Sequence, residues 1–192
     1  MKYQNNGADD KELVIAAKKN PDEFQAIVTR YWGRLFSYIR RMSYFSQEDI
    51  EDILQEVFIK IYRYLNDYDE GMTFSTWVYQ ITRNTVIDEI RKRKARPQTI
   101  WLENEDLVKV LKSSLSLEKE YFDNDALEKI KEIITQMPDK YREVLILRFI
   151  EEKSYEEIVD IVQLPKGTIA SLINRGRKII IDQVSERGLM SK

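Results

Sequence analysis

Two segments of the sequence, residues 83–96 and 165–178, concentrate the basic side chains that can bind a polyanion. Lysine and arginine neutralise phosphates, which supplies much of the affinity of proteins for nucleic acid. Residues 103–128, between the two segments, are rich in aspartate and glutamate. The pattern indicates two contacts with nucleic acid joined by a segment that avoids it, although a charged run taken alone is more often a solvated face.

Aromatic side chains precede or accompany the first basic segment: Tyr62, Tyr64, Tyr68, Trp77 and Tyr79. Beside cations, such rings could stack on single-stranded or flipped bases. The alternative is that these rings belong to the core, and the pattern favours that alternative for Trp77.

Neither cysteine nor histidine occurs among the 192 residues. Disulfides, ordinary zinc sites and catalysis by histidine or by a Cys-His pair are therefore excluded. Four polar residues at helical spacing could be read as a carboxylate metal site: Glu51, Asp52, Gln55 and Glu56. No second set of acids accompanies them, so a protein-docking face or a solvated face is favoured.

The helix predicted over residues 73–96 carries the first basic segment. Its apolar residues divide between two nearly opposite faces, Phe74, Trp77, Val78 and Ile81 on one and Val86, Ile87 and Ile90 on the other. An apolar face of a helix is buried against another element of the fold. Because this helix has two such faces, we expect it to be sandwiched between other helices.

Three helices are predicted before it, over residues 9–19, 21–42 and 47–65, from apolar residues at three- and four-residue steps. The third opens with a capping-box-like start at Ser46. A turn-rich loop, residues 66–72, then leads into the helix that carries the basic segment.

The second half of the chain begins with an acidic segment, residues 97–125, that reads as a linker. Helices are predicted over residues 127–137 and 141–150, followed by a helix-turn-helix with a capping box at Ser154 and a second helix that starts near Thr168. The residues of that second helix expected to face inward are Ile169, Ile173, Gly176 and Ile180.

No strand pattern or repeat is evident, so the predicted fold class is all-α. We expect two small helical domains, residues 1–96 and 126–192, with the linker of residues 97–125 between them. No apolar run has the length of a signal-peptide core or of a membrane span, so a cytosolic protein without membrane insertion is expected.

The second helix of a helix-turn-helix enters the major groove and places its early residues against base edges. Its outward positions here are Ala170, Ser171, Asn174, Arg175 and Lys178. Arg175 could pair with guanine and Asn174 with adenine. The competing interpretation is a plain helical hairpin with a solvated face; the joint presence of capping box, turn and basic face favours DNA binding.

Four segments resemble, in order and spacing, the two-domain bacterial sigma factors of the extracytoplasmic-function (ECF) group of the sigma-70 family. They are EDIEDILQEVFIKIYRYL (48–65), FSTWVYQITRNTVIDEIRKRK (74–94), MPDKYREVLILRFIEEKSYEEIV (137–159) and LPKGTIASLINRGRK (164–178). The resemblance covers nearly the whole chain apart from the first residues and the linker.

The resemblance implies that the first domain docks on core RNA polymerase, through its beta and beta-prime subunits, and reads and melts the minus-10 promoter element. The implied docking residues are Glu51, Asp52, Gln55 and Glu56. The implied minus-10 residues, which include the loop that would capture a flipped base, are Asn66, Tyr68, Arg83, Asn84, Arg91, Lys92, Arg93 and Lys94. The implied minus-35 residues are Lys166, Thr168, Ser171, Asn174, Arg175 and Lys178.

The resemblance further implies a non-enzyme with no cofactor, metal or small-molecule substrate, because core polymerase supplies the catalytic metal. The protein would act in the bacterial cytoplasm and join the nucleoid within the holoenzyme. Expected partners besides promoter DNA are an anti-sigma factor or a separate DNA-bound recruiting factor.

Two features depart from the family pattern. Ala170 and Leu172 stand where basic residues are usual, and the loop of residues 66–72 carries three acids. Because each lost bidentate base contact costs about 1–3 kcal/mol of discrimination, the hypothesis is weak or assisted reading of the minus-35 element.

Three other functions are compatible with the same motifs. A helix-turn-helix regulator would not need polymerase, and a sigma-like adaptor with degraded DNA contacts would give no promoter-dependent transcript. A carboxylate-only nuclease is the remotest alternative.

Overall fold

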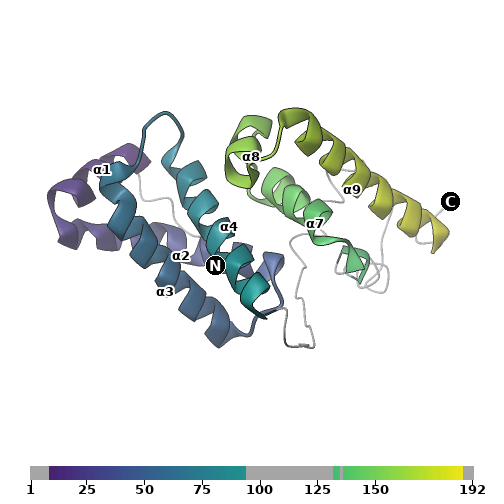
Figure 1. Ribbon diagram of the computed structural model, residues 1–192, viewed down its shortest axis with the longest axis horizontal. Helices are drawn as coiled ribbons and strands as arrows, with labels where there is room; N and C mark the ends of the chain where they lie inside the picture. Colours follow the sequence, from purple (N-terminus) through teal and green to yellow (C-terminus); the bar gives the residue numbers. More distant parts are fainter. Residues whose placement is uncertain (1–8, 94–131, 135, 188–192) are drawn as a thin grey trace. The chain divides into compact units, whose positions relative to one another are not determined.

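The computed structural model describes residues 9–93, 132–134 and 136–187, and all regular structure in these ranges is helical (Figure 1). This confirms the all-α prediction. The chain divides into two compact units, Met1–Gln98 and Thr99–Lys192. The predicted linker and Lys94 lie outside the described residues, and the domain boundaries drawn from the sequence stay predictions.

In unit 1, residues 9–93 form four α-helices: α1 (Asp10–Lys19), α2 (Phe24–Met42), α3 (Gln47–Tyr64) and α4 (Phe74–Arg93). Short 3₁₀ turns, Pro21–Glu23 and Leu65–Asp67, precede α2 and follow α3. The predicted helix ends are close to these bounds because local capping sets them. At Ser46 both halves of a capping box form: the hydroxyl accepts from Asp49 N, and the Asp49 carboxylate accepts from Ser46 N.

Helix α4 packs against α1, α2 and α3, which confirms that it is sandwiched. Its buried residues include three threonines, Thr76, Thr82 and Thr85, that the apolar pattern did not reveal. The hydroxyls of Thr82 and Thr85 donate to the carbonyl oxygens of Val78 and Ile81, at 2.8 and 2.9 Å. Their polar atoms are thus satisfied within the helix, and the threonines can be buried.

Unit 2 is described from Glu132 onward, where residues 132–134 and 136 are helical. Helix α7 (Asp139–Leu145) continues into a π-helical turn, Ile146–Ile150, and then come α8 (Tyr155–Val162) and α9 (Lys166–Glu186). Both α7 and α8 pack on α9, and Ile169, Ile173, Gly176 and Ile180 are all buried, as predicted.

Gly176 lies where α9 passes close to α7. A methyl group placed on it would lie 3.0 Å from Leu145 Cδ1 and 3.4 Å from Tyr141 Cβ. A small residue is therefore needed at this crossing of the two helices.

Candidate nucleic-acid interface

The outer face of α3 carries the predicted docking residues. Asp52, Gln55 and Glu56 are exposed, and Glu51 is half-buried. Glu51 accepts a hydrogen bond from Gln47 Nε2 at 2.9 Å. Glu56 forms an ion pair with Lys60 at 2.7 Å. The structure thus brings the four residues onto the solvent side of one helix, and in the described residues no three acidic side chains converge as a metal site.

Two apolar side chains extend this face: Ile59, which the sequence reasoning missed, and Tyr62, which it considered as a base-stacking ring or a core ring. Ile59 is 56% exposed and Tyr62 is 50% exposed, and they lie one and two turns beyond Gln55 on the same side of α3. The available signal was that Ile59 falls out of phase with the buried residues of α3. Exposed apolar residues beside a polar face are typical of a protein-docking surface.

The loop between α3 and α4 is held in a fixed turn. Tyr68 donates from its hydroxyl to Met72 O at 2.7 Å, and Gly71 N donates to Asp69 Oδ1 at 3.0 Å. The Tyr68 ring lies 5.3 Å from the Phe74 ring and 5.2 Å from the Trp77 ring, centroid to centroid. Tyr68 and Trp77 are both half-buried, so they brace the loop, whereas Asn66 is exposed at its start.

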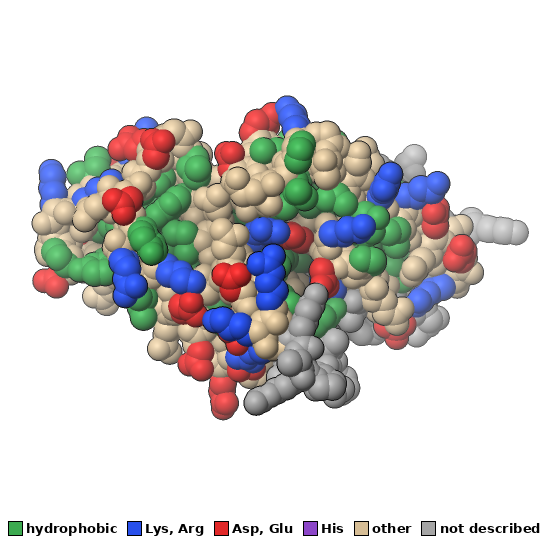
Figure 2. All heavy atoms as spheres, viewed as in Figure 1, with side chains coloured by type: hydrophobic (Ala, Val, Ile, Leu, Met, Phe, Trp, Pro, Cys, Tyr) green, Lys and Arg blue, Asp and Glu red, His purple; other side chains and the backbone are tan. Residues whose placement is uncertain are grey.

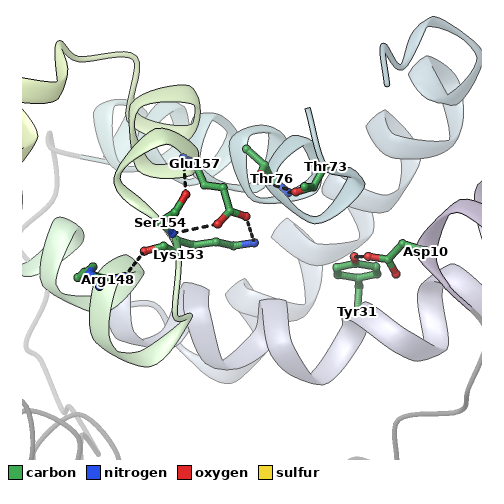
Figure 3. A network of polar contacts seen from close by, with 8 residues as sticks. All are labelled: Asp10, Tyr31, Thr73, Thr76, Arg148, Lys153, Ser154 and Glu157. Carbon is green, nitrogen blue, oxygen red and sulfur yellow. Dashed lines mark hydrogen bonds and ion pairs between the residues drawn. The ribbon is translucent and has the colours of Figure 1, made fainter. Parts of the chain in front are cut away.

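The start of α4 is capped by Thr73. Its hydroxyl accepts from Thr76 N at 3.2 Å and lies 2.8 Å from the Thr76 hydroxyl (Figure 3). This cap fixes where the loop ends and the helix begins.

The solvent side of α4 presents the predicted polar and basic residues. Asn84, Arg91 and Lys92 are exposed, and Arg83 is half-buried. Arg91 pairs with Asp88 at 3.4 Å and Lys92 with Glu89 at 3.6 Å, in surface ion pairs that are worth little and that a phosphate could replace.

Arg93 differs from its basic neighbours Arg91 and Lys92, with which it forms the basic tail of α4. Its guanidinium bonds Asp49 of α3 at 2.7 Å and Glu89 at 2.5 Å, and lies 4.7 Å from the centre of the Phe45 ring. The hydrogen bond from Arg93 lowers the pKa of both carboxyl groups, and those bonds raise the pKa of Arg93. Its side chain is 28% exposed, whereas that of Arg91 is 73% exposed.

The helix-turn-helix of unit 2 is fixed by a polar network at its start (Figure 3). Ser154 and Glu157 form a capping box, and the Glu157 carboxylate also accepts from Lys153 Nζ at 3.1 Å. Arg148 donates to Lys153 O at 2.9 Å. The turn passes through Gln163, whose backbone is left-handed at φ 60°, and α9 begins at Lys166, two residues before the predicted start.

The predicted base-reading residues share one exposed side of α9. Ser171, Asn174, Arg175 and Lys178 are spaced at three- and four-residue steps and all are exposed. Thr168 is exposed in the first turn, and Lys166 forms an ion pair with Glu156 of α8. Ala170 and Leu172 are half-buried.

Acidic and basic side chains are interspersed over the face of the molecule that Figure 2 shows. The candidate contacts are therefore local clusters, in keeping with a net charge of −2. No helix in the described part of the chain is long and apolar enough to cross a membrane.

Two family models match the chain. Sigma-70 region 2 matches residues 27–96, which end just beyond α4, and Sigma-70, region 4 matches residues 127–180, which include the helix-turn-helix. Together they cover more than half of the sequence.

Among curated relatives, the ECF RNA polymerase sigma factor SigW of Bacillus subtilis is 31% identical over 185 residues, covering 92% of this chain and 96% of the relative. The sigma-H factor of Pseudomonas aeruginosa is 32% identical over 177 residues (89% and 91%). The ECF sigma-E factor of Escherichia coli K12 is 31% identical over 181 residues (91% and 94%).

The solved structures that share the fold include two complexes. CnrH in complex with the cytosolic domain of CnrY has a TM-score of 0.64 at 22% identity, covering 92% of this chain and 97% of that one. The sigma factor RpoE in complex with the anti-sigma factor NepR from Bartonella quintana has a TM-score of 0.61 at 18% identity (85% and 97%). With both sigma regions matched in order, and relatives above 30% identity along nearly their whole length, the chain belongs to the ECF group of the sigma-70 family.

Proposed function

We propose that the protein is the sigma subunit that binds core RNA polymerase and directs promoter-specific initiation, with unit 1 reading and melting the minus-10 element and unit 2 contacting the minus-35 region. Membership of the ECF group supports the role as a sigma factor. The observation that carries the proposal for unit 1 is that its helical bundle presents an exposed acidic face on α3, which could bind polymerase, and an exposed basic end on α4, which could bind DNA. Initiation itself needs no catalytic residue from this chain, because the polymerase performs the chemistry.

Docking on polymerase is assigned to the exposed face of α3. Asp52, Gln55 and Glu56 supply charge and hydrogen-bond acceptors, and Ile59 and Tyr62 supply apolar area. Glu51 lies beside them. An interface of this kind has an apolar centre with a charged rim that steers association. The beta and beta-prime subunits are the proposed receptors.

Reading of the minus-10 element is assigned to the loop and α4. Asn66 at the start of the loop is placed to contact a base drawn out of the duplex, while Tyr68 holds the loop in shape. Arg83, Asn84, Arg91 and Lys92 would contact the backbone, since phosphate contacts position a protein on DNA and base contacts specify the sequence. Lys94 belongs to the same proposed tail.

Reading of the minus-35 element is proposed to be weak. Two positions of α9, Ala170 and Leu172, offer neither charge nor hydrogen-bond donor. Lys166 forms an exposed ion pair with Glu156, which competes with phosphate for the lysine. The proposed contacts are Lys166, Thr168, Ser171, Asn174, Arg175 and Lys178. Promoter choice would then depend mainly on the minus-10 element or on a second DNA-bound factor.

Regulation by an anti-sigma factor is also proposed for this chain, because the sigma factor RpoE of Bartonella quintana, which shares its fold, was solved in complex with the anti-sigma factor NepR. The protein would act in the bacterial cytoplasm, with the nucleoid as its site of action in the holoenzyme.

Transcription from a random promoter library with core polymerase tests the proposal. The wild-type protein should yield promoter-dependent transcripts that share a minus-10 sequence. A combined Asp52→Lys and Glu56→Lys variant should abolish them, whereas Glu12→Lys, an exposed change on α1, should not. A plain regulator or a non-productive adaptor would give no promoter-dependent transcript with core enzyme. Strong loss of transcription on deleting the upstream element alone would refute weak minus-35 reading.

A further inference from the structure

Arg93 is the point at which the end of α4 meets the start of α3. Its guanidinium contacts three groups from different parts of unit 1: the Asp49 carboxylate in the first turn of α3, the Glu89 carboxylate one turn earlier in α4, and the Phe45 ring before α3. Asp49 is itself fixed, because it belongs to the capping box with Ser46.

We propose that Arg93 is a positioning residue rather than a contact to promoter phosphates: it clamps the last turn of α4 to the capped end of α3. The clamp sets the direction in which Arg91 and Lys92 leave the bundle toward DNA. The inference rests on the proposed function of α4 and replaces the DNA-binding role predicted for Arg93 with a role within unit 1.

Charge and exposure distinguish Arg93 from its neighbours. Its two carboxylate partners more than neutralise it, so a phosphate would have to displace Asp49 and Glu89 to bind there. Among the residues that the structure describes, Arg91 pairs with Asp88 and Lys92 with Glu89, both on their own helix, and the side chains of Arg91 and Lys92 are 73% and 65% exposed. An arginine with two fixed acceptors and a ring on its face is pre-organised for one geometry.

The clamp also links two functional surfaces. Asp49 lies one turn before Asp52 on α3, so the helix end that Arg93 holds is the end from which the docking face starts. Arg93 thereby fixes the DNA-facing end of α4 relative to the helix that would bind polymerase.

The two roles predict opposite effects for Asp49→Asn. If Arg93 served as a phosphate contact, removing a competing carboxylate would free it and raise DNA affinity. If Arg93 is a clamp, the same substitution weakens the clamp and lowers affinity. Asparagine at position 49 can still accept the hydrogen bond from Ser46 N through Oδ1, so the substitution keeps this part of the capping box. Ser46→Ala is the control that measures the effect of losing the cap alone.

The experiment measures promoter binding and open-complex formation by reconstituted holoenzyme over a series of salt concentrations. Arg93→Gln and Asp49→Asn should each reduce open-complex formation roughly tenfold with an unchanged salt slope. The matched control is Arg91→Gln. It should reduce the salt slope, which is the slope of the logarithm of the binding constant against the logarithm of salt concentration, by about one. The charge-exchanged double variant, Asp49→Arg with Arg93→Asp, should recover part of the lost activity, and Arg93→Lys should retain part of it.

Two results would overturn the clamp: a rise in affinity with Asp49→Asn, or a fall of about one in the salt slope with Arg93→Gln. If wild-type holoenzyme formed no promoter-dependent open complex, the proposed function would fail instead. The clamp would then be tested by urea unfolding of the full chain. The double variant, Asp49→Asn with Arg93→Gln, should lose little more free energy of unfolding than the more destabilising single variant. Independent, additive effects would overturn it.

Discussion

The hydroxyl of Tyr31 donates a hydrogen bond to Asp10 Oδ2 at 2.6 Å, and this contact ties the first residue of α1 to the middle of α2 (Figure 3). The other oxygen of the same carboxylate accepts from Arg30 at 2.7 Å. Tyr31 is fully buried, and its ring lies 5.7 Å from that of Phe74, which contacts Tyr68 in turn. Helix α1 therefore supports the loop proposed to read the minus-10 element.

Tyr31→Phe should destabilise unit 1, because it removes a part-buried hydrogen bond to a charged group without changing the ring. The expected loss in the free energy of unfolding is about 1.5–3 kcal/mol. Urea unfolding followed by tryptophan fluorescence, in a Trp101→Phe background, reports on this unit through Trp32 and Trp77. Tyr62→Phe, at a half-exposed ring, should change the midpoint little; equal effects of the two substitutions would argue against the contact.

The helices could be predicted from sequence because their determinants are local. The capping pairs Ser46 with Asp49 and Ser154 with Glu157 lie three residues apart, and each forms as predicted. The inward residues of α9 follow from helical periodicity alone.

The contacts between helices could not be predicted in the same way. Periodicity tells which side of a helix is buried, and it does not tell which residue lies opposite. Asp49 and Arg93 are far apart in the sequence, so the run of basic residues indicated a DNA-binding tail and gave no sign that Arg93 pairs with a residue of another helix. The burial of Thr82 and Thr85 in α4 could not be predicted for another reason. Threonine is polar, so it falls outside the apolar pattern, but these two hydroxyls donate to backbone carbonyls of their own helix and can therefore be buried.

Gly176→Val should destabilise unit 2 by about 1–3 kcal/mol, because its first added carbon already falls 3.0 Å from Leu145 and overpacking forces side chains to shift. Gly167→Ala is the matched control in the same helix. Beyond the two neighbouring residues and the backbone of its own helix, nothing lies within 4 Å of a methyl group at that position, so the higher helix propensity of alanine should leave stability unchanged or raised by up to about 1 kcal/mol. Thermal unfolding followed by circular dichroism measures both; a tolerated valine would contradict the close crossing of α7 and α9.

The stability of unit 1 should depend on pH through the acids that hold Arg93. The pKa of Asp49 is lowered from 3.8 and that of Glu89 from 4.5, chiefly by the hydrogen bond from Arg93. Folding therefore favours the ionised carboxylates, and their contribution is fully present above the ordinary pKa values and lost as pH falls through the lowered ones.

Urea unfolding between pH 7 and pH 3 should accordingly show a constant contribution from this cluster at neutral pH and a decline below about pH 4.5. Arg93→Gln should flatten the decline, because the two pKa values return toward their ordinary range. An unchanged pH profile in that variant would mean that other carboxylates govern the acid sensitivity.

Glu156→Gln should strengthen binding of the helix-turn-helix to DNA. Glu156 holds Lys166 at the start of α9, where a lysine is placed to meet phosphate, and Lys166 lowers the pKa of that carboxyl group, which is therefore ionised at neutral pH. Removing the carboxylate releases the lysine, so affinity should rise about threefold to tenfold at low salt and the gain should shrink as salt increases.

Fluorescence anisotropy of holoenzyme on promoter fragments with the upstream element gives the measurement. Asp182→Asn, an exposed change farther along α9, should have little effect. In a Lys166→Gln background the gain from Glu156→Gln should disappear; if it persists there, it reflects the loss of one negative charge near DNA and not the release of Lys166.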